Sequence, residues 1–111
     1  MKVIKIGARA SVGKRTQEVL EIIREGQAQV MMTAIGPKAV NQAVKISAEV
    51  LSHLREAGIS CSLDARKDVI ELSEERTAHR ILMIITAEGR GFYVNSKQTS
   101  NAGSGNPGGR V

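Results

Sequence analysis

The stretch AQVMMTAIGPKAV, residues 28–40, decides the fold, because it joins an expected buried strand directly to an expected helix. Residues 28–35 are apolar enough for a strand buried inside a sheet. Gly36 ends that strand and Pro37 opens the helix, since proline at the first helical position loses no hydrogen bond. We expect this helix over about residues 37–57, with Gly58 capping its end. Its predicted apolar stripe is Val40, Ala43, Val44, Ser47, Val50, Leu51 and Leu54.

Upstream of this stretch, the sequence predicts a strand, a loop and a helix. Residues 3–6 form a short β-branched run, and turn-forming residues follow at 7–11. Apolar residues then recur at helical spacing from Val12 to Ile23, and Gly26 follows as a terminator. Ser11 is the expected N-cap, because its hydroxyl can accept a hydrogen bond from an amide of the first turn.

Downstream, the pattern predicts two more strands that pair as an antiparallel hairpin. Alternation at 61–65 indicates a strand that resumes at 69–72 after a charged kink at residues 66–68. Residues 73–79 are a polar connection, and 81–85 form a continuous apolar strand. The order βαβαββ predicts an α/β chain that closes as an α+β two-layer sandwich, with a mixed four-stranded sheet and two helices.

The length of 111 residues favours a single domain, which we place at residues 1–87. From residue 88 onward Gly, Ser and Asn dominate without hydrophobic periodicity, so we expect 88–111 to be a flexible tail. Cys61 is the single cysteine, and no His/Cys cluster predicts a metal site or a cofactor. No apolar run approaches the roughly 18 residues of a membrane span, so we expect a cytoplasmic protein.

The positive charge lies unevenly along the chain. The net charge is +5, and residues 1–45 hold eight basic and three acidic side chains, whereas residues 46–87 hold five and seven. The loops after the first two strands lie at neighbouring ends of parallel strands, where two helix N-termini also favour a phosphate. The alternative is a solvated charged edge without a ligand. The basic residues that converge there are Arg9, Lys14, Arg15 and Lys38.

The residues do not support an enzyme. Residues 7–16 lie between a strand and a helix, as a P-loop does, but five residues separate Gly7 from Gly13 where four are required. Arg15 occupies the position of the magnesium-binding hydroxyl. Cys61 and the two histidines lack a third orienting group or an oxyanion site, so we predict no catalytic residues.

Two stretches resemble the stage V sporulation protein S family: residues 34–45, AIGPKAVNQAVK, and residues 74–78, EERTA. The first strand and the helix start at Ser11 fit as well, although the first loop is a few residues shorter, and the resemblance spans about residues 1–87. The family is similar in fold to the archaeal Alba chromatin proteins and to the C-terminal domain of a bacterial translation initiation factor.

The resemblance implies nucleic-acid binding by a homodimer or higher homo-oligomer, with a regulatory role in spore development. By similarity to Alba proteins, the first loop and the last hairpin would bind. The matching residues are Arg9, Lys14, Arg15 and Arg76, with Lys38, Asn41, Gln42 and Lys45 from the family's helix motif. The hairpin carries two acids beside Arg76, a weak arrangement for an arm that grips phosphates.

Two functions therefore remain open. The first is non-catalytic binding of DNA or RNA through the phosphate backbone, in a cytoplasmic protein that can associate with the nucleoid. Base stacking is not expected, because Phe92 and Tyr93 are the only aromatic residues. The second is an oligomeric scaffold or developmental regulator without direct nucleic-acid contact, in which residues 41–45 form a subunit interface. An exposed apolar strip on the sheet or second helix would favour the second function.

Overall fold

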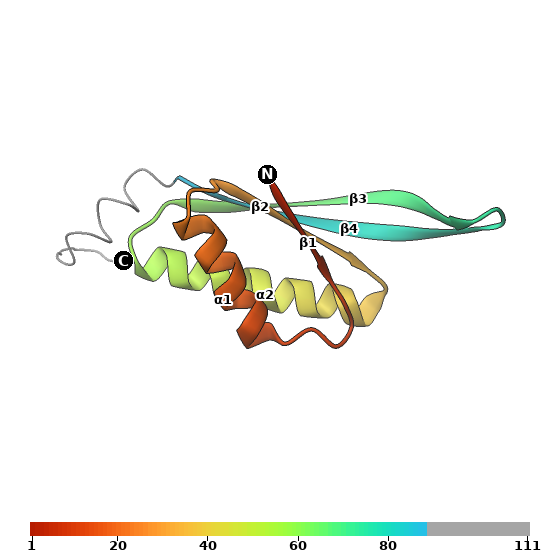
Figure 1. The fold of residues 1–111 in the computed structure, drawn as a ribbon, viewed down its shortest axis with the longest axis horizontal. Coiled ribbons are helices and arrows are strands. Elements are labelled where there is room, and N and C mark those ends of the chain that lie inside the picture. The colour runs from red at the N-terminus through yellow and green to blue at the C-terminus, as the bar shows by residue number, and fades with distance from the viewer. Residues whose placement is uncertain (89–111) are drawn as a thin grey trace.

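The computed structural model describes residues 1–88 and shows the predicted βαβαββ order (Figure 1). Phe92 and Tyr93 and the expected tail beyond residue 88 lie outside the described residues. The elements are β1 (Lys2–Ile6), α1 (Val12–Arg24), β2 (Gln29–Ile35), α2 (Pro37–Glu56), β3 (Cys61–Ser73) and β4 (Arg76–Ala87).

The four strands form one mixed sheet in the order β1-β2-β4-β3. β1 and β2 are parallel, whereas β4 is antiparallel to both β2 and β3. Both helices lie on one side of this sheet (Figure 1). The predicted α+β two-layer sandwich is therefore confirmed, and the hairpin of β3 and β4 is antiparallel as expected.

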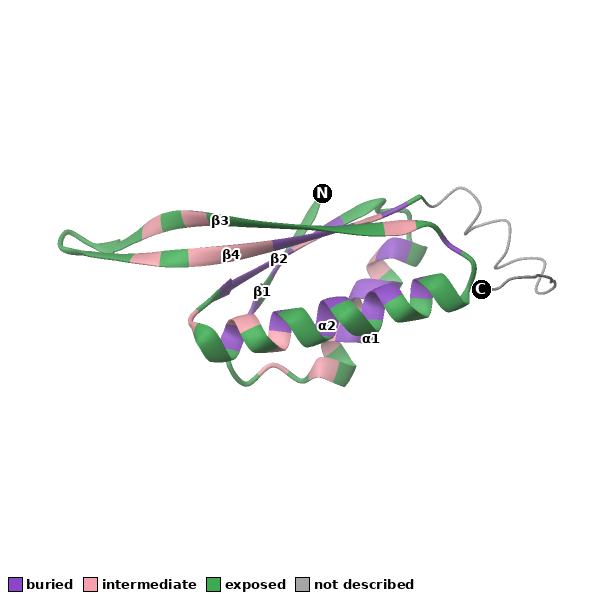
Figure 2. Cartoon of the chain, turned by 180° about the vertical axis from the view of Figure 1, so that it is seen from behind, coloured by how far each residue is buried: buried purple, intermediate pink, exposed green. Residues whose placement is uncertain are grey.

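The core lies between the sheet and the two helices, because strand side chains alternate between the two faces of the sheet (Figure 2). The predicted stripe of α2 is only partly right. Val44 is 47% exposed, whereas Ala39 and Ile46, which the stripe omitted, are buried. Val44 follows Ala43 by about 100° around the helix, outside the arc that packs on the sheet. The fully buried side chains include Val19, Ile23, Val30, Met32, Ile46, Val50, Leu54 and Ile85.

The hairpin is longer than predicted. The expected kink at residues 66–68 is wrong, because β3 runs through them, and the expected connection at 73–79 shrinks to a turn at residues 74–75. One charged pair joins the two strands in this register: Arg80 donates to the Asp68 carboxylate from Nε at 3.0 Å and from Nη2 at 2.6 Å. The register shift of the hairpin lies between Glu71 and Ser73, beside the turn.

Much of the hairpin projects beyond the rest of the sheet. Ile35, the last residue of β2, pairs with Arg80, which pairs on its other side with Asp68. Residues 69–79, called the arm below, therefore extend past the end of β2 with no other strand of residues 1–88 beside them, as Figures 1 and 2 show. At the usual rise of a strand, the arm is about 20 Å long.

Candidate nucleic-acid interface

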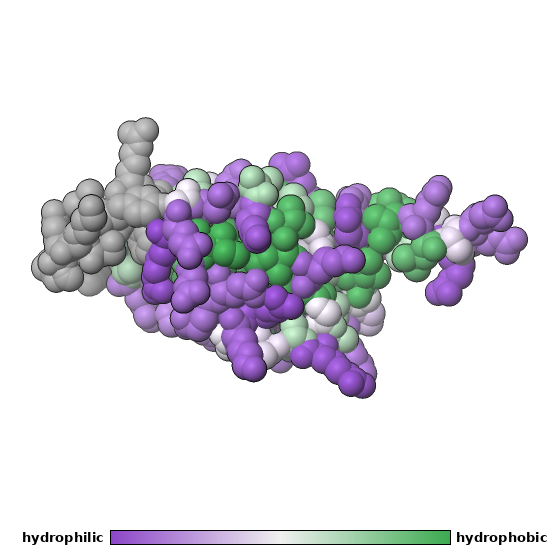
Figure 3. All heavy atoms as spheres, in the orientation of Figure 1, coloured by the Kyte–Doolittle hydropathy of each residue, from purple (hydrophilic) through white to green (hydrophobic). Residues whose placement is uncertain are grey.

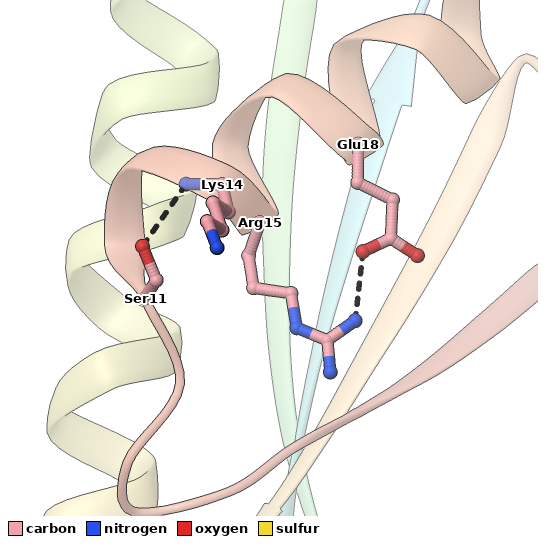
Figure 4. Close-up of polar contacts among 4 residues, drawn as sticks. All are labelled: Ser11, Lys14, Arg15 and Glu18. Carbon is pink, nitrogen blue, oxygen red and sulfur yellow. Dashed lines mark hydrogen bonds and ion pairs between the residues drawn. The ribbon is translucent and has the colours of Figure 1, made fainter.

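The ends of β1 and β2 bring two loops and two helix starts to the same edge of the sheet. The strands are parallel neighbours, and Ile6 pairs with Ala34. The loop after β1 turns through a hydrogen bond from Ala10 N to Gly7 O of 3.1 Å. Ser11 then caps α1, since its Oγ accepts a hydrogen bond from the Lys14 amide at 3.2 Å (Figure 4). The predicted N-cap is confirmed.

A side chain of α2 fixes this loop. Gln42 Nε2 donates a hydrogen bond of 2.8 Å to the carbonyl oxygen of Ala10. Lys38 and Lys45 lie four residues before and three residues after Gln42, so all three occupy the same face of α2. Asn41 is exposed beside them. The loop and this face of α2 therefore form one continuous surface.

The cations on this surface differ in how far their charge is already offset. Arg9, Lys14, Lys38 and Lys45 are exposed, and within residues 1–88 no carboxylate lies at ion-pair distance from any of them. We call these four residues the basic edge. Arg15 instead donates from Nη1 to Glu18 Oε1 at 2.7 Å, as Figure 4 shows. The Arg15 charge is therefore partly neutralised within its own helix.

The start of α2 adds backbone donors to the basic edge. Gly36 is the N-cap residue, with φ of 90°, a left-handed conformation that favours glycine. It has no side chain to occupy the amides of the first turn, and Pro37 follows at the first helical position. Neither helix has an acidic residue in its first turn. Both N-termini keep their partial positive charge facing the same edge.

Arg76 does not belong to this surface. It is exposed at the start of β4, next to the turn of the arm. Glu71, Glu74 and Glu75 accompany it, so the arm carries a formal charge of −2 with its histidine neutral. The structure brings together the predicted residues of the loop and of α2, and it places the predicted Arg76 four residues, or about 13 Å, beyond the end of β2.

Lys67 is a cation that the sequence analysis did not select. It pairs with Ile81, which pairs with Ala34, so Lys67 lies at the level where β2 ends. It is exposed and unpaired within residues 1–88, whereas neighbouring Arg66 donates to Asp64 at 2.8 Å. The strand alternation, continued through residues 66–68, puts Lys67 on the opposite face of the sheet from Arg66 and Asp68, and this pattern could have identified Lys67 from the sequence.

Cys61 and the two histidines make no hydrogen bond with one another within residues 1–88. Cys61 opens β3, and burial raises the pKa of its thiol, an effect that nearby Arg55 partly offsets. His79 lies on the arm, and His53 lies on α2 at 4.0 Å from Glu49. Within residues 1–88 no three His, Cys, Asp or Glu side chains gather as metal ligands. In that same part of the chain, neither helix is long and apolar enough to cross a membrane.

The architecture defined by this sheet and these helices is that of Alba-type proteins. Alba from Thermoplasma volcanium matches the structure with a TM-score of 0.62 and 16% identity, over 77% of this chain and 99% of that chain. ALBA1 from Trypanosoma brucei matches with a TM-score of 0.53 and 12% identity, over 86% and 79% of the two chains. These similarities confirm the predicted fold.

The chain belongs to the Stage V sporulation protein S (SpoVS) family, whose model matches residues 2–87. The family resemblance of residues 34–45 and 74–78 is thereby confirmed. No curated protein matches the chain in sequence.

Proposed function

We propose that this protein binds DNA or RNA without catalysis, by holding backbone phosphates at the basic edge. The observation that carries the proposal is four exposed cations, unpaired within residues 1–88, on the loop after β1, the start of α1 and one face of α2, beside two helix N-termini without an acidic residue. The hydrogen bond from Gln42 to Ala10 supports it, because this bond joins the two halves of the surface. Phosphates suit such a site, since ammonium groups and free backbone amides both attract them.

The mode of binding follows from what this surface contains. Both aromatic residues of the chain come after residue 88, so the described fold has no aromatic side chain on which a base could stack. Contacts to phosphates position a protein on nucleic acid but carry no sequence information directly. The proposed binding is therefore tolerant of sequence and sensitive to salt. Arg15 and Asn41 lie beside the four cations as secondary contacts, and Arg76 lies outside the site.

We extend the proposal to a regulatory role connected with sporulation, which the description of the family suggests, and to a homo-oligomer. We place the protein in the cytoplasm, associated with the nucleoid through its nucleic-acid contacts. We propose a single domain at residues 1–87, and the family model matches residues 2–87 of the chain.

A second candidate function, an oligomeric protein scaffold, is favoured by apolar surface between α2 and β3. Val44 on α2 is 47% exposed and Leu63 on β3 is 39% exposed. The two elements run side by side, since the Cys61 thiol lies 3.9 Å from the Leu51 carbonyl oxygen. Val44→Asp should disrupt a homo-oligomer formed through this surface, as measured by sedimentation. If that variant stays fully associated, this strip is not the interface.

The two functions are separated by a comparison of charge-matched variants. Lys14→Ala/Lys38→Ala removes two cations of the basic edge, whereas Lys2→Ala/Arg24→Ala removes two exposed cations from the start of β1 and the end of α1. Fluorescence anisotropy with labelled duplex DNA and RNA at low salt should show an affinity loss of about tenfold or more for the first variant. The second variant should lose about threefold or less in affinity. Equal losses of affinity in the two variants would mean that binding depends only on net charge, which would contradict a site at the basic edge.

A further inference from the structure

The arm has a chemistry that nucleic acid does not explain. Its three carboxylates outnumber its single guanidinium, so phosphates would be repelled from its tip. Val69 and Leu72 are also 58% and 51% exposed, although the arm consists of two paired strands. Figure 3 shows hydrophilic side chains at the tip of the arm and apolar ones behind them. Exposed apolar side chains rimmed by charges are typical of a protein contact.

The surface that complements the arm in charge is the basic edge of the same chain. Its four cations, Arg9, Lys14, Lys38 and Lys45, are unpaired within residues 1–88 and match the three carboxylates of the arm in charge. An arm cannot reach the edge of its own molecule, because it is a continuous antiparallel ribbon that extends away from the end of β2. A second copy is the partner that supplies this surface.

We propose that the arm of one copy docks on the basic edge of a second copy. Both surfaces lie at the same end of the molecule, where β1 and β2 finish and the arm begins (Figure 1). A two-fold axis at that end allows each arm to reach the other molecule's edge, which closes the assembly as a reciprocal pair. Glu71, Glu74 and Glu75 then face the lysines and the arginine of the second copy's basic edge. Val69 and Leu72 become buried in the contact.

This contact would regulate the nucleic-acid site, a consequence that rests on the proposed function. The carboxylates of the arm and the phosphates of a nucleic acid would occupy the same cations, so the two ligands compete. Self-association would lower the apparent affinity for nucleic acid, and nucleic acid would separate the arm from the edge. Removing the acidic charge of the arm should therefore strengthen nucleic-acid binding.

Carbodiimide cross-linking tests the contact directly, because it joins a carboxylate to an amine only where the two groups meet. A mixture of ¹⁵N-labelled and unlabelled full-length chain is cross-linked at low salt and analysed by mass spectrometry. We expect mixed-isotope peptide pairs that join Glu74 or Glu75 to Lys14 or Lys38, and their loss on addition of salt. Absence of these intermolecular pairs, or their formation only within one chain, would overturn the proposal.

A charge exchange gives a second test that does not depend on cross-linking. Glu74→Lys/Glu75→Lys and Lys14→Glu/Lys38→Glu alter exposed residues, and circular dichroism checks that each variant is folded. Each variant alone should lose the concentration-dependent association seen by sedimentation, and an equimolar mixture should regain it. A mixture that stays dissociated, or variants that associate like the native chain, would contradict the contact. Nucleic-acid binding is assayed separately, so loss of that function leaves this result intact.

Discussion

Gln42 and Ala10 lie 32 residues apart in the sequence, and a hydrogen bond of 2.8 Å joins the Gln42 side chain to the Ala10 carbonyl. This bond indicates that Gln42 has a structural role at the basic edge. Its amide nitrogen holds the loop after β1 against α2, so the residue organises the basic edge from within. Arg9, on one side of the bond, and Lys38, on the other, are brought to one surface through it.

Gln42→Ala should therefore weaken nucleic-acid binding although it removes no charge. A hydrogen bond of this kind contributes about 0.5–1.5 kcal/mol, so we expect an affinity loss of about two- to tenfold. Hydrogen exchange of the amides at residues 8–11 should accelerate at the same time. Gln17→Ala, an exposed glutamine of α1, is the control. Unchanged exchange in the loop would show that the bond does not hold it.

Glu18→Gln should strengthen nucleic-acid binding, because the Glu18 carboxylate forms an ion pair with the Arg15 guanidinium, with 2.7 Å between Oε1 and Nη1. The substitution removes one negative charge near the basic edge and frees one cation for a phosphate. The log–log salt slope should steepen by about one. Glu21→Gln, an exposed acid one turn further along α1, should have the smaller effect. Identical gains from both variants would mean that only net charge matters.

Thr16→Val should stabilise the fold. Thr16 is 3% exposed, and its Oγ1 has no hydrogen-bond partner within residues 1–88. A buried hydroxyl without a partner costs free energy, so replacing it with a methyl group should raise the free energy of unfolding by about 1 kcal/mol. The converse change on the same helix, Val19→Thr at a fully buried position, should lower it by about 1–3 kcal/mol. Urea denaturation measures both. A destabilised Thr16→Val variant would contradict this reasoning.

The pair of Asp68 and Arg80 at the root of the arm should stabilise the fold in a pH-dependent way. Hydrogen bonds from Arg80 hold the pKa of Asp68 below its ordinary value of 3.8. Because the pKa is lower in the folded chain than in the unfolded chain, the stabilisation is complete above that ordinary value and is lost as the pH falls through the lowered one.

Asp68→Asn should therefore reduce the free energy of unfolding at pH 7, and its difference from the native chain should shrink below about pH 4. Asp64→Asn is the matched control, because the side chains of Asp64 and Arg66 are 56% and 66% exposed. Its effect should be smaller at every pH. A deficit of Asp68→Asn that is constant from pH 7 to pH 3 would rule out this explanation.

The fold could be predicted largely because its core segments have clear periodicity. The apolar run at 28–35, the Gly36–Pro37 boundary and the Ser11 cap are local signals, and each is where the sequence placed it. The continuity of β3 through residues 66–68 and the early start of β4 at Arg76 were missed, because a ribbon exposed on both faces has no need of apolar alternation. Charged residues such as Lys67 and Asp68 then resemble a loop, although cross-strand pairs keep them in the sheet.

The candidate site could be predicted only in part. Convergence of the first loop with the start of α2 follows from two parallel strands, which the pattern already implied. The pairing of Arg15 with Glu18 is one of several possible i, i+3 contacts, and the bond from Gln42 depends on how two helices pack. The first contact is a choice among local side-chain conformations and the second arises from tertiary structure, so the residue types alone do not show which cations remain free.

The salt dependence of binding by the unmodified full-length chain tests the central claim most directly. Labelled duplex DNA and RNA are titrated with folded protein at several salt concentrations between about 50 and 200 mM. Four or five phosphate contacts at the basic edge predict a log–log slope of about −4 on duplex DNA, with little dependence on base sequence. No binding at the lowest salt, or an affinity that salt does not change, would contradict it.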